Sequence, residues 1–198
     1  MKTTIKIAIA ALTLASFGFE GCKKGADDPF LSLHTRKGRV AGDWKVSQGN
    51  GTITDVFGTR TWTYDGTTKV TTQGAGSVSE NITMTYSFVK DGTYKMIVTT
   101  TTSSPNNVET ETYTGTWNFT GKVGDDKNKD HIVLKTLTDT DVNTNPSNSS
   151  VTTYTGDDAP VSVMYLDELK NKEIIFKYTG TTNPGNSSDS GQWTLTPQ

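Results

Sequence analysis

The sequence predicts an all-β domain built as an antiparallel barrel or as a β-sandwich. From Gly42 to the C-terminus, apolar and polar residues alternate with a period of two, as in strands that bury one face. Threonine, a β-branched residue that favours strands, makes up about a fifth of the 198 residues. Short apolar runs are separated by turn-forming residues at regular spacing, and no long helical pattern is present.

The clearest strand is the segment in which Ile82, Met84, Tyr86 and Phe88 alternate with small polar residues. A hairpin turn at residues 90–93 follows it, and the glycine there suits the positive φ of such turns. In the first half of the domain, strands are predicted at residues 43–46, 60–64, 69–72, 82–88 and 94–98.

Aromatic residues mark the strands of the second half, where Tyr113, Trp117 and Phe119 are predicted to share one face. Strand segments are predicted at residues 108–120, 131–134, 151–154, 161–165, 173–179 and 191–195. The segment at residues 69–72 continues past a turn, and we expect the eleven segments of both halves to form roughly eight to ten antiparallel strands. Residues 140–150 are predicted to form a polar loop and residues 166–169 a single helical turn. Ahead of the first strand, a short helix is expected to start at residues 29–33 and to end at Gly38.

Residues 1–21 have the pattern of a secretory signal peptide. Lys2 and Lys6 give a positive start, and the apolar stretch that follows carries no charge before Glu20. The stretch is shorter than the ~20 apolar residues that a membrane-spanning helix needs. A buried N-terminal helix is the alternative, and the break at residues 21–24 disfavours it.

Cys22 is the only cysteine, which excludes an intrachain disulfide. The stretch Phe19-Glu20-Gly21-Cys22 resembles the lipobox of bacterial lipoproteins, in which a small residue precedes a cysteine that becomes the lipidated first residue. Gly21 fits that pattern, whereas Phe19 and Glu20 depart from the aliphatic and small residues usual there. The resemblance implies attachment to a membrane through acyl groups on Cys22. An ordinary signal peptide with an incidental free thiol is the alternative.

The segment after the cysteine indicates a tether. Residues 22–40 are expected to form this tether and a short helical lead-in, and residues 41–198 the barrel. Residues 23–28 resemble the short acidic signals that direct some Gram-negative lipoproteins to the outer face of the outer membrane; a plain solvated tether is the alternative. We therefore expect an outer-membrane lipoprotein, on the periplasmic side or at the cell surface.

A family resemblance narrows the barrel prediction. Gly42-Asp43-Trp44 resembles the Gly-x-Trp that begins the first strand of lipocalins, and the segments "FVKDGTY" at residues 88–94 and "YLDELKNKEIIFKY" at residues 165–178 match lipocalin-like lipoproteins of Gram-negative bacteria. The resemblance implies an up-and-down barrel whose closed end is packed by Trp44. Lipocalins usually cover that tryptophan with a late basic residue; only Lys170 or Lys172 stands where one is expected.

Charge and motifs argue against several function classes. A net charge of −2 without a basic stripe argues against a nucleic-acid binder. His34 and His131 are the only histidines and lie far apart in the chain, which argues against a zinc site. The acidic run at residues 139–145 alternates oxygen ligands, but Thr144 and Ser150 stand where a calcium loop needs Gly and Glu. We therefore predict no metal and no cofactor.

Catalytic motifs are equally weak. The run at residues 74–77 lacks the Gly-x-Ser-x-Gly pattern of a nucleophile elbow. Glu109 and Glu111 share a strand face, as acid–base catalysis would require, but a solvated face is the simpler interpretation. We predict that the protein is not an enzyme.

The barrel interior is the remaining candidate site, because small antiparallel barrels either fill their interior or hold one small ligand. Two functions stay open: a monomeric binding module for a small apolar or amphipathic molecule, or a surface interaction or structural protein with a filled barrel. The candidate lining residues are aromatic: Trp62, Tyr64, Tyr86, Phe88, Tyr94, Trp117, Phe119, Phe176, Tyr178 and Trp193.

Overall fold

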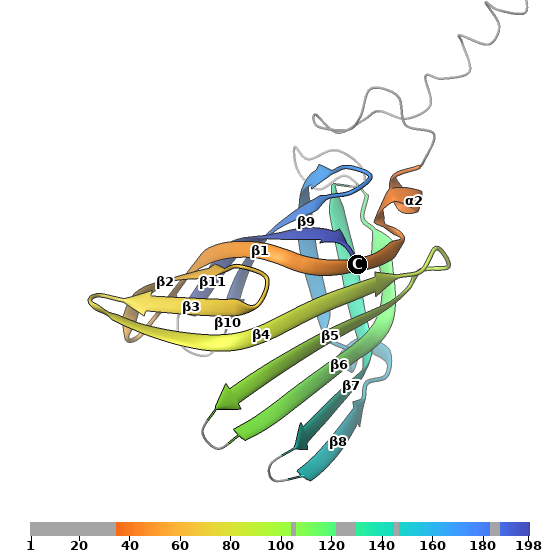
Figure 1. Ribbon diagram of the computed structural model, residues 1–198. Helices are drawn as coiled ribbons and strands as arrows, with labels where there is room; N and C mark the ends of the chain where they lie inside the picture. The colour runs from red at the N-terminus through yellow and green to blue at the C-terminus, as the bar shows by residue number, and fades with distance from the viewer. Residues whose placement is uncertain (1–34, 104–105, 122–129, 145–146, 183–186) are drawn as a thin grey trace, which may run out of the picture.

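The computed structural model describes residues 35–103, 106–121, 130–144, 147–182 and 187–198, which form an antiparallel β-barrel (Figure 1). The strands follow one another around the barrel in chain order, with the exception of β8. This arrangement confirms the predicted up-and-down barrel, and the sandwich alternative is wrong.

The described residues contain eleven strands, slightly more than predicted, and one short α-helix before them. In chain order these elements are α2 (Arg36–Val40), β1 (Gly42–Asp55), β2 (Gly58–Tyr64), β3 (Thr68–Gln73), β4 (Gly76–Phe88), β5 (Thr93–Ser103), β6 (Asn106–Phe119), β7 (His131–Thr144), β8 (Ser147–Thr153), the 3₁₀ turn η1 (Gly156–Asp158), β9 (Val161–Leu169), β10 (Ile174–Thr182) and β11 (Ser187–Pro197).

At the end near α2, which we call the capped end, eight strands close the ring. There the first residues of β1 pair directly with the last residues of β4, so that Gly42 lies opposite Phe88 and Lys45 opposite Thr85. The ring continues through β5, β6, β7, β9, β10 and β11 and returns to β1, where Trp44 lies opposite Pro197.

Toward the opposite end, which we call the wide end, the β2–β3 hairpin raises the number of strands in the ring to ten, although β9 pairs with β7 and β10 only nearer the capped end. From Gly49 onward β1 pairs with β2 instead of β4, and the β2–β3 hairpin is inserted between β1 and β4. The exchange follows a register shift between Val46 and Gln48. Because the diameter of a barrel grows with its number of strands, this insertion widens the interior.

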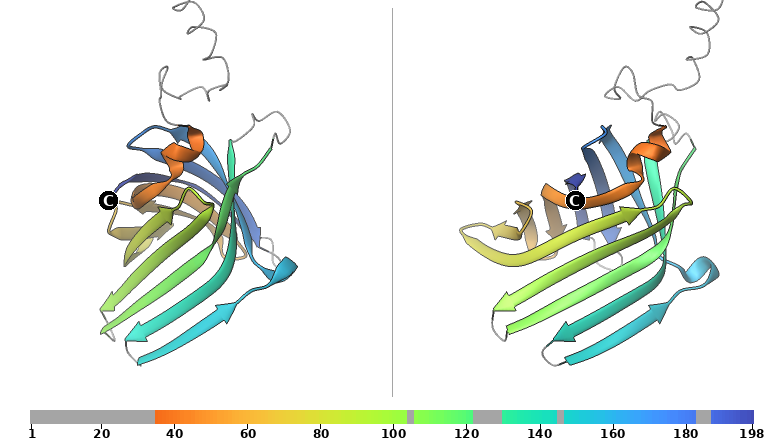
Figure 2. Two further views of the ribbon diagram at one scale, coloured as in Figure 1. Left: turned by 90° about the vertical axis from the view of Figure 1, so that its right-hand side faces the viewer. Right: turned by 45° about the vertical axis from the view of Figure 1, so that its right-hand side comes forward.

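β8 lies outside the ring of ten strands. It forms a hairpin with residues 138–144 of β7, whereas β9 pairs with residues 131–135 of the same strand. Each β8 residue is exposed to solvent. β8 therefore forms the lower border of the sheet at the wide end, as both views of Figure 2 show.

The hydrophobic core fills the capped end. Trp117 packs edge-on against Phe88 with ring centroids 5.4 Å apart, and its indole N–H donates a hydrogen bond to the Val89 carbonyl (2.9 Å). The surrounding aliphatic side chains come from five strands and are at most 4% exposed: Val46, Ile132, Leu134, Leu166, Leu169, Ile174 and Leu195. This end of the barrel is packed with side chains.

α2 covers the capped end and is tied to it by two buried hydrogen bonds. The Arg39 guanidinium donates to the Leu169 carbonyl (2.9 Å), and the Trp44 indole N–H donates to the Val40 carbonyl (2.8 Å). The buried basic residue at this end is thus Arg39, which precedes the first strand, whereas Lys170 and Lys172 are exposed.

Three local predictions were wrong. Residues 166–169 belong to β9: a bulge at Asp167 lets Leu166 and Leu169 both face the core, and this spacing of three imitates a helix. Residues 140–150, predicted as a loop, lie largely in the β7–β8 hairpin. Gly38 lies inside α2 and does not end it, and the expected helix start at residues 29–33 lies outside the described residues.

The bulge between β6 and β7 depends on a glycine. A methyl group at Gly115 would lie 2.0 Å from the backbone carbonyl oxygen of Lys135. We expect Gly115→Ala to lower the free energy of unfolding by about 2–3 kcal/mol, because backbone atoms cannot move aside as a flexible side chain would. Urea unfolding followed by tryptophan fluorescence measures this loss. Gly76→Ala is the control, since its methyl would meet its nearest neighbour at an ordinary 3.6 Å. Equal losses in both variants would contradict the expectation.

Candidate functional site

The predicted lining residues separate into two groups. Five of them belong to the packed core of the capped end and are at most 7% exposed: Tyr86, Phe88, Tyr94, Trp117 and Phe176. Phe119 is partly buried and contacts the edge of Trp117, with centroids 5.8 Å apart. Their rings pack against one another, so these residues serve the core in this structure.

The remaining predicted residues form an aromatic cluster toward the wide end, comprising Trp62, Tyr64, Tyr178 and Trp193. The indoles of Trp62 and Trp193 are stacked, with centroids 4.5 Å apart and an interplanar angle of 28°. Tyr64 meets Trp193 edge-on at 5.6 Å. Trp193 and Tyr178 are only partly buried, whereas Trp62 and Tyr64 are buried.

Glycines on β1 and β11 allow these rings to lie flat against the barrel wall. An added methyl group would come within 2.2 Å of Trp193 at Gly49, within 2.5 Å of Trp62 at Gly51, and within 2.6 Å of Trp62 at Gly191. The rings therefore occupy the volume that side chains at these positions would otherwise fill. The aromatic cluster covers the wall and does not extend straight across the interior.

The aromatic cluster carries polar groups in specific positions. The Tyr178 hydroxyl donates a hydrogen bond to Asp189 (3.0 Å), and desolvation, together with this bond and the charge of Asp189, raises the Tyr178 pKa. Lys69 Nζ lies 5.4 Å from the centroid of the Trp62 ring. The Trp62 Nε1 hydrogen is buried and meets no acceptor among the described residues. A buried hydrogen-bond donor beside the cluster is thus unsatisfied within the described part of the chain.

Carboxylates occupy another part of the interior wall at the wide end. We define the acidic wall as Glu109 and Glu111 of β6 together with Asp139 and Asp141 of β7. Register places Glu111 opposite Asp141, on the same face as Tyr113, which packs against the core. No lysine or arginine of the described residues forms an ion pair with these four groups. The acidic wall therefore gives this side of the interior a negative potential.

Burial and neighbouring charges raise the pKa of one carboxyl group of the acidic wall, that of Glu111. Desolvation raises the pKa of Glu111, and the neighbouring charges of Glu109, Asp139 and Asp141 raise it further, against a hydrogen bond from Tyr113 that lowers it. The Tyr113 pKa is raised as well, chiefly by desolvation and then by the adjacent carboxylates. Glu111 and Tyr113 therefore lie where the ionised form of either side chain is poorly solvated.

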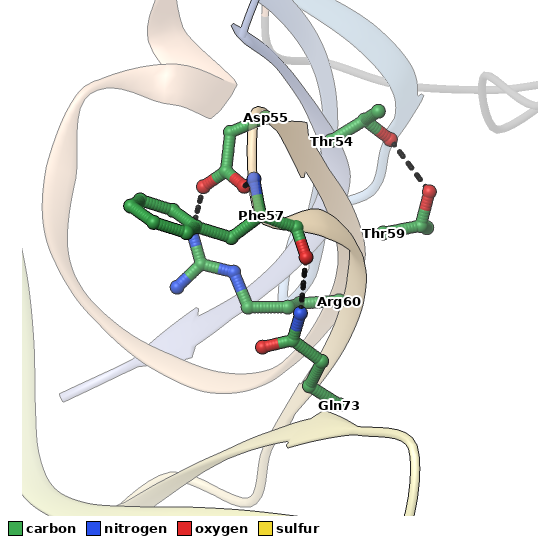
Figure 3. A network of polar contacts seen from close by, with 6 residues as sticks. All are labelled: Thr54, Asp55, Phe57, Thr59, Arg60 and Gln73. Carbon is green, nitrogen blue, oxygen red and sulfur yellow. Dashed lines mark hydrogen bonds and ion pairs between the residues drawn. The ribbon is translucent and has the colours of Figure 1, made fainter.

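The β1–β2 hairpin presents two apolar side chains to solvent, and Figure 3 shows one of them, Phe57, with the polar contacts of the turn. Val56 and Phe57 are each 78% exposed. The backbone beneath them is fixed: the Phe57 N–H donates to Asp55 (2.9 Å), the Gln73 side-chain amide donates to the Phe57 carbonyl (2.6 Å), and Arg60 forms an ion pair with Asp55. Phe57 thus offers an apolar surface distinct from the barrel interior.

The metal sites considered from the sequence are not formed by the described residues. No group of three or more His, Cys, Asp or Glu residues there is arranged to hold a metal ion. Asp139 and Asp141 lie in β7, so the run considered as a calcium loop is mainly strand. No helix of the described residues is long and apolar enough to cross a membrane. Cys22 and the segment 1–34 lie outside the described residues.

Neither a comparison with protein-family models nor a search of curated proteins finds a match for this chain.

The sequence predicted that Glu109 and Glu111 share a strand face, but it did not predict Asp139 and Asp141 on the neighbouring strand. The predicted loop covered residues 140–150, because polar residues on both faces of 139–144 conceal the alternation of a strand. A usable signal exists in "TLTDTDV", where carboxylates repeat at every second position and β-branched residues stand between them. The same period in "VETETYT" gives the opposing strand.

Neutralising one carboxylate of the acidic wall should change the pH dependence of stability. Because the Glu111 pKa is higher in the folded than in the unfolded protein, the free energy of unfolding falls as pH rises through the interval between the two values. We expect Glu111→Gln to raise the unfolding temperature at pH 7 and to lose this advantage below about pH 4. Thermal unfolding from pH 4 to 7 measures the effect, with Glu80→Gln on the exposed part of β4 as control. A gain that persists unchanged at pH 4 would refute this linkage.

Proposed function

We propose that this protein is a small-molecule binding module whose site is the wide-end interior beside the aromatic cluster. The observation that carries the proposal is the set of glycines under Trp62 and Trp193, which places both rings flat on the wall where the ring has ten strands. Trp62 is itself buried, whereas Trp193 is only partly buried and offers an aromatic face to a ligand. The packed capped end forms the floor of the site.

The chemistry of the wall indicates the class of ligand. An apolar or aromatic group would pack on Trp193 and Tyr178, which are both only partly buried. The carboxylates of the acidic wall repel a negatively charged ligand group that would be buried beside them. We therefore propose a small amphipathic ligand that is neutral or positively charged, and not a fatty acid.

Binding of a neutral fluorescent probe tests the site. We expect N-phenyl-1-naphthylamine to bind the purified protein and to quench tryptophan fluorescence by energy transfer. Trp193→Ala should weaken its binding about tenfold, the equivalent of 1.4 kcal/mol, because it removes the exposed stacking surface. The anionic probe 1-anilinonaphthalene-8-sulfonate should bind more weakly than the neutral one.

Phe57→Ala is the matched control, since Phe57 is a highly exposed aromatic residue outside the interior. Binding that depends on Phe57 and not on Trp193 would assign the probe to the hairpin tip and would refute the interior site. Absence of binding by the folded protein would instead favour a filled barrel that acts through its outer surface.

We further propose that the module is a lipoprotein held at the outer membrane through acyl groups on Cys22. The proposal is supported by the signal-peptide pattern of residues 1–21 and by the lipobox resemblance of residues 19–22. Two or three acyl chains anchor a protein stably, whereas one chain gives only reversible binding.

Mass spectrometry of the mature protein tests the anchor. We expect an N-terminal Cys22 that carries acyl groups, and we expect Cys22→Ser to release the protein from the membrane fraction. An unmodified thiol and α-amino group at Cys22, in a protein recovered without membranes, would rule the anchor out. This result would leave the interior site untouched, so the two proposals can be judged separately.

A further inference from the structure

The outer edge of β8 has no partner strand among the described residues. β8 is the last strand in the sheet order and pairs only with β7. A strand in this position presents unpaired backbone N–H and C=O groups, which are a template for another strand. Proteins usually protect such edges with lysines, prolines or a covering segment. β8 carries none of these residue types, and residues 142–156 contain no charged residue.

An aliphatic surface adjoins this edge. Five of the nine large apolar side chains that are exposed in the described residues lie on the outer side of β7, β8 and β9, and we call them the aliphatic patch: Leu137, Val142, Val151, Val161 and Val163. Val151, on the edge strand itself, is 67% exposed. Apolar residues concentrated beside an unpaired edge indicate an interaction surface rather than scattered surface valines.

We propose that β8 pairs antiparallel with β8 of a second copy of this chain. A two-fold axis at Ser150 would place Ser149 of each copy opposite Val151 of the other and would join the two β7–β8 hairpins into one continuous sheet. The Val151 side chains of the two copies would be diagonal neighbours on its outer face. Such an interface is self-complementary, as a two-fold dimer requires.

The second copy fits this edge better than a charged peptide does. Each edge is neutral, so two copies approach without the repulsion that identical charged strands would experience. The interface also extends the aliphatic patch across the axis and removes exposed valine surface from water. This assembly replaces the monomer expected from the sequence and leaves the barrel interior accessible, so it is independent of the proposed ligand site.

Sedimentation velocity on the full chain tests the assembly, in a Cys22→Ser background that excludes disulfide exchange. We expect a concentration-dependent dimer. The double variant Ser149→Lys/Val151→Lys sets four like charges across the axis and should weaken dimerisation by about tenfold or more. The control is Thr61→Lys/Thr63→Lys, which adds the same charges to exposed positions on β2, a strand whose two neighbours are both present.

Cysteine cross-linking provides a second measurement that does not depend on destabilising the interface. Ser150→Cys should cross-link two copies through a short bis-maleimide, and Thr63→Cys should not. A monomeric wild-type protein at the highest concentration, or equal dimerisation of both lysine variants, would overturn the proposal. A cross-link from Ser150→Cys to a different protein would assign the edge to a foreign strand and would overturn it as well.

Discussion

The exchange of partners along one edge of β1 determines the shape of the barrel. The first residues of β1 pair with β4, and those beyond the irregularity at Ser47 pair with β2. A backbone edge can hydrogen-bond to only one neighbour at each position, so the β2–β3 hairpin can enter only where β4 has been released. The β2–β3 hairpin therefore adds two strands to the ring of eight within the length of one strand. The narrow half closes on its own side chains.

Each half of the interior follows from this difference in width. In the narrow half, Trp117 and Phe88 pack edge-to-face within the core, and α2 covers this core through the Arg39 and Trp44 hydrogen bonds. In the broad half the chain has glycine at Gly49, Gly51 and Gly191, and aromatic rings replace the missing side chains along the wall. Polar and charged groups also line this half, among them Glu109, Glu111, Asp139 and Asp141. The same chain thus combines an apolar core at one end with a wall of aromatic and acidic side chains at the other.

The sequence predicted the class of fold and most strands, but not the pairing that shapes the site. Alternation of apolar and polar residues, as from Ile82 to Phe88, is a local pattern that predicts a strand without knowledge of the strands that pair with it. Contacts between residues far apart in the chain decide which strand pairs with β1 at each position and whether β8 belongs to the ring. Asp139 and Asp141 were missed because polar residues occupy both faces of their strand. The helical turn predicted at residues 166–169 was wrong because a bulge changes the spacing of the inward residues Leu166 and Leu169 from two to three.

The stacked indoles of Trp62 and Trp193 have an optical consequence. Two indoles 4.5 Å apart with planes inclined by only 28° couple their electronic transitions, and this coupling gives a paired band in circular dichroism that isolated tryptophans lack. The sign and size of such a band depend on the mutual orientation of the rings. The circular dichroism band of this indole pair therefore reports any rotation of Trp62 or Trp193 without an added label.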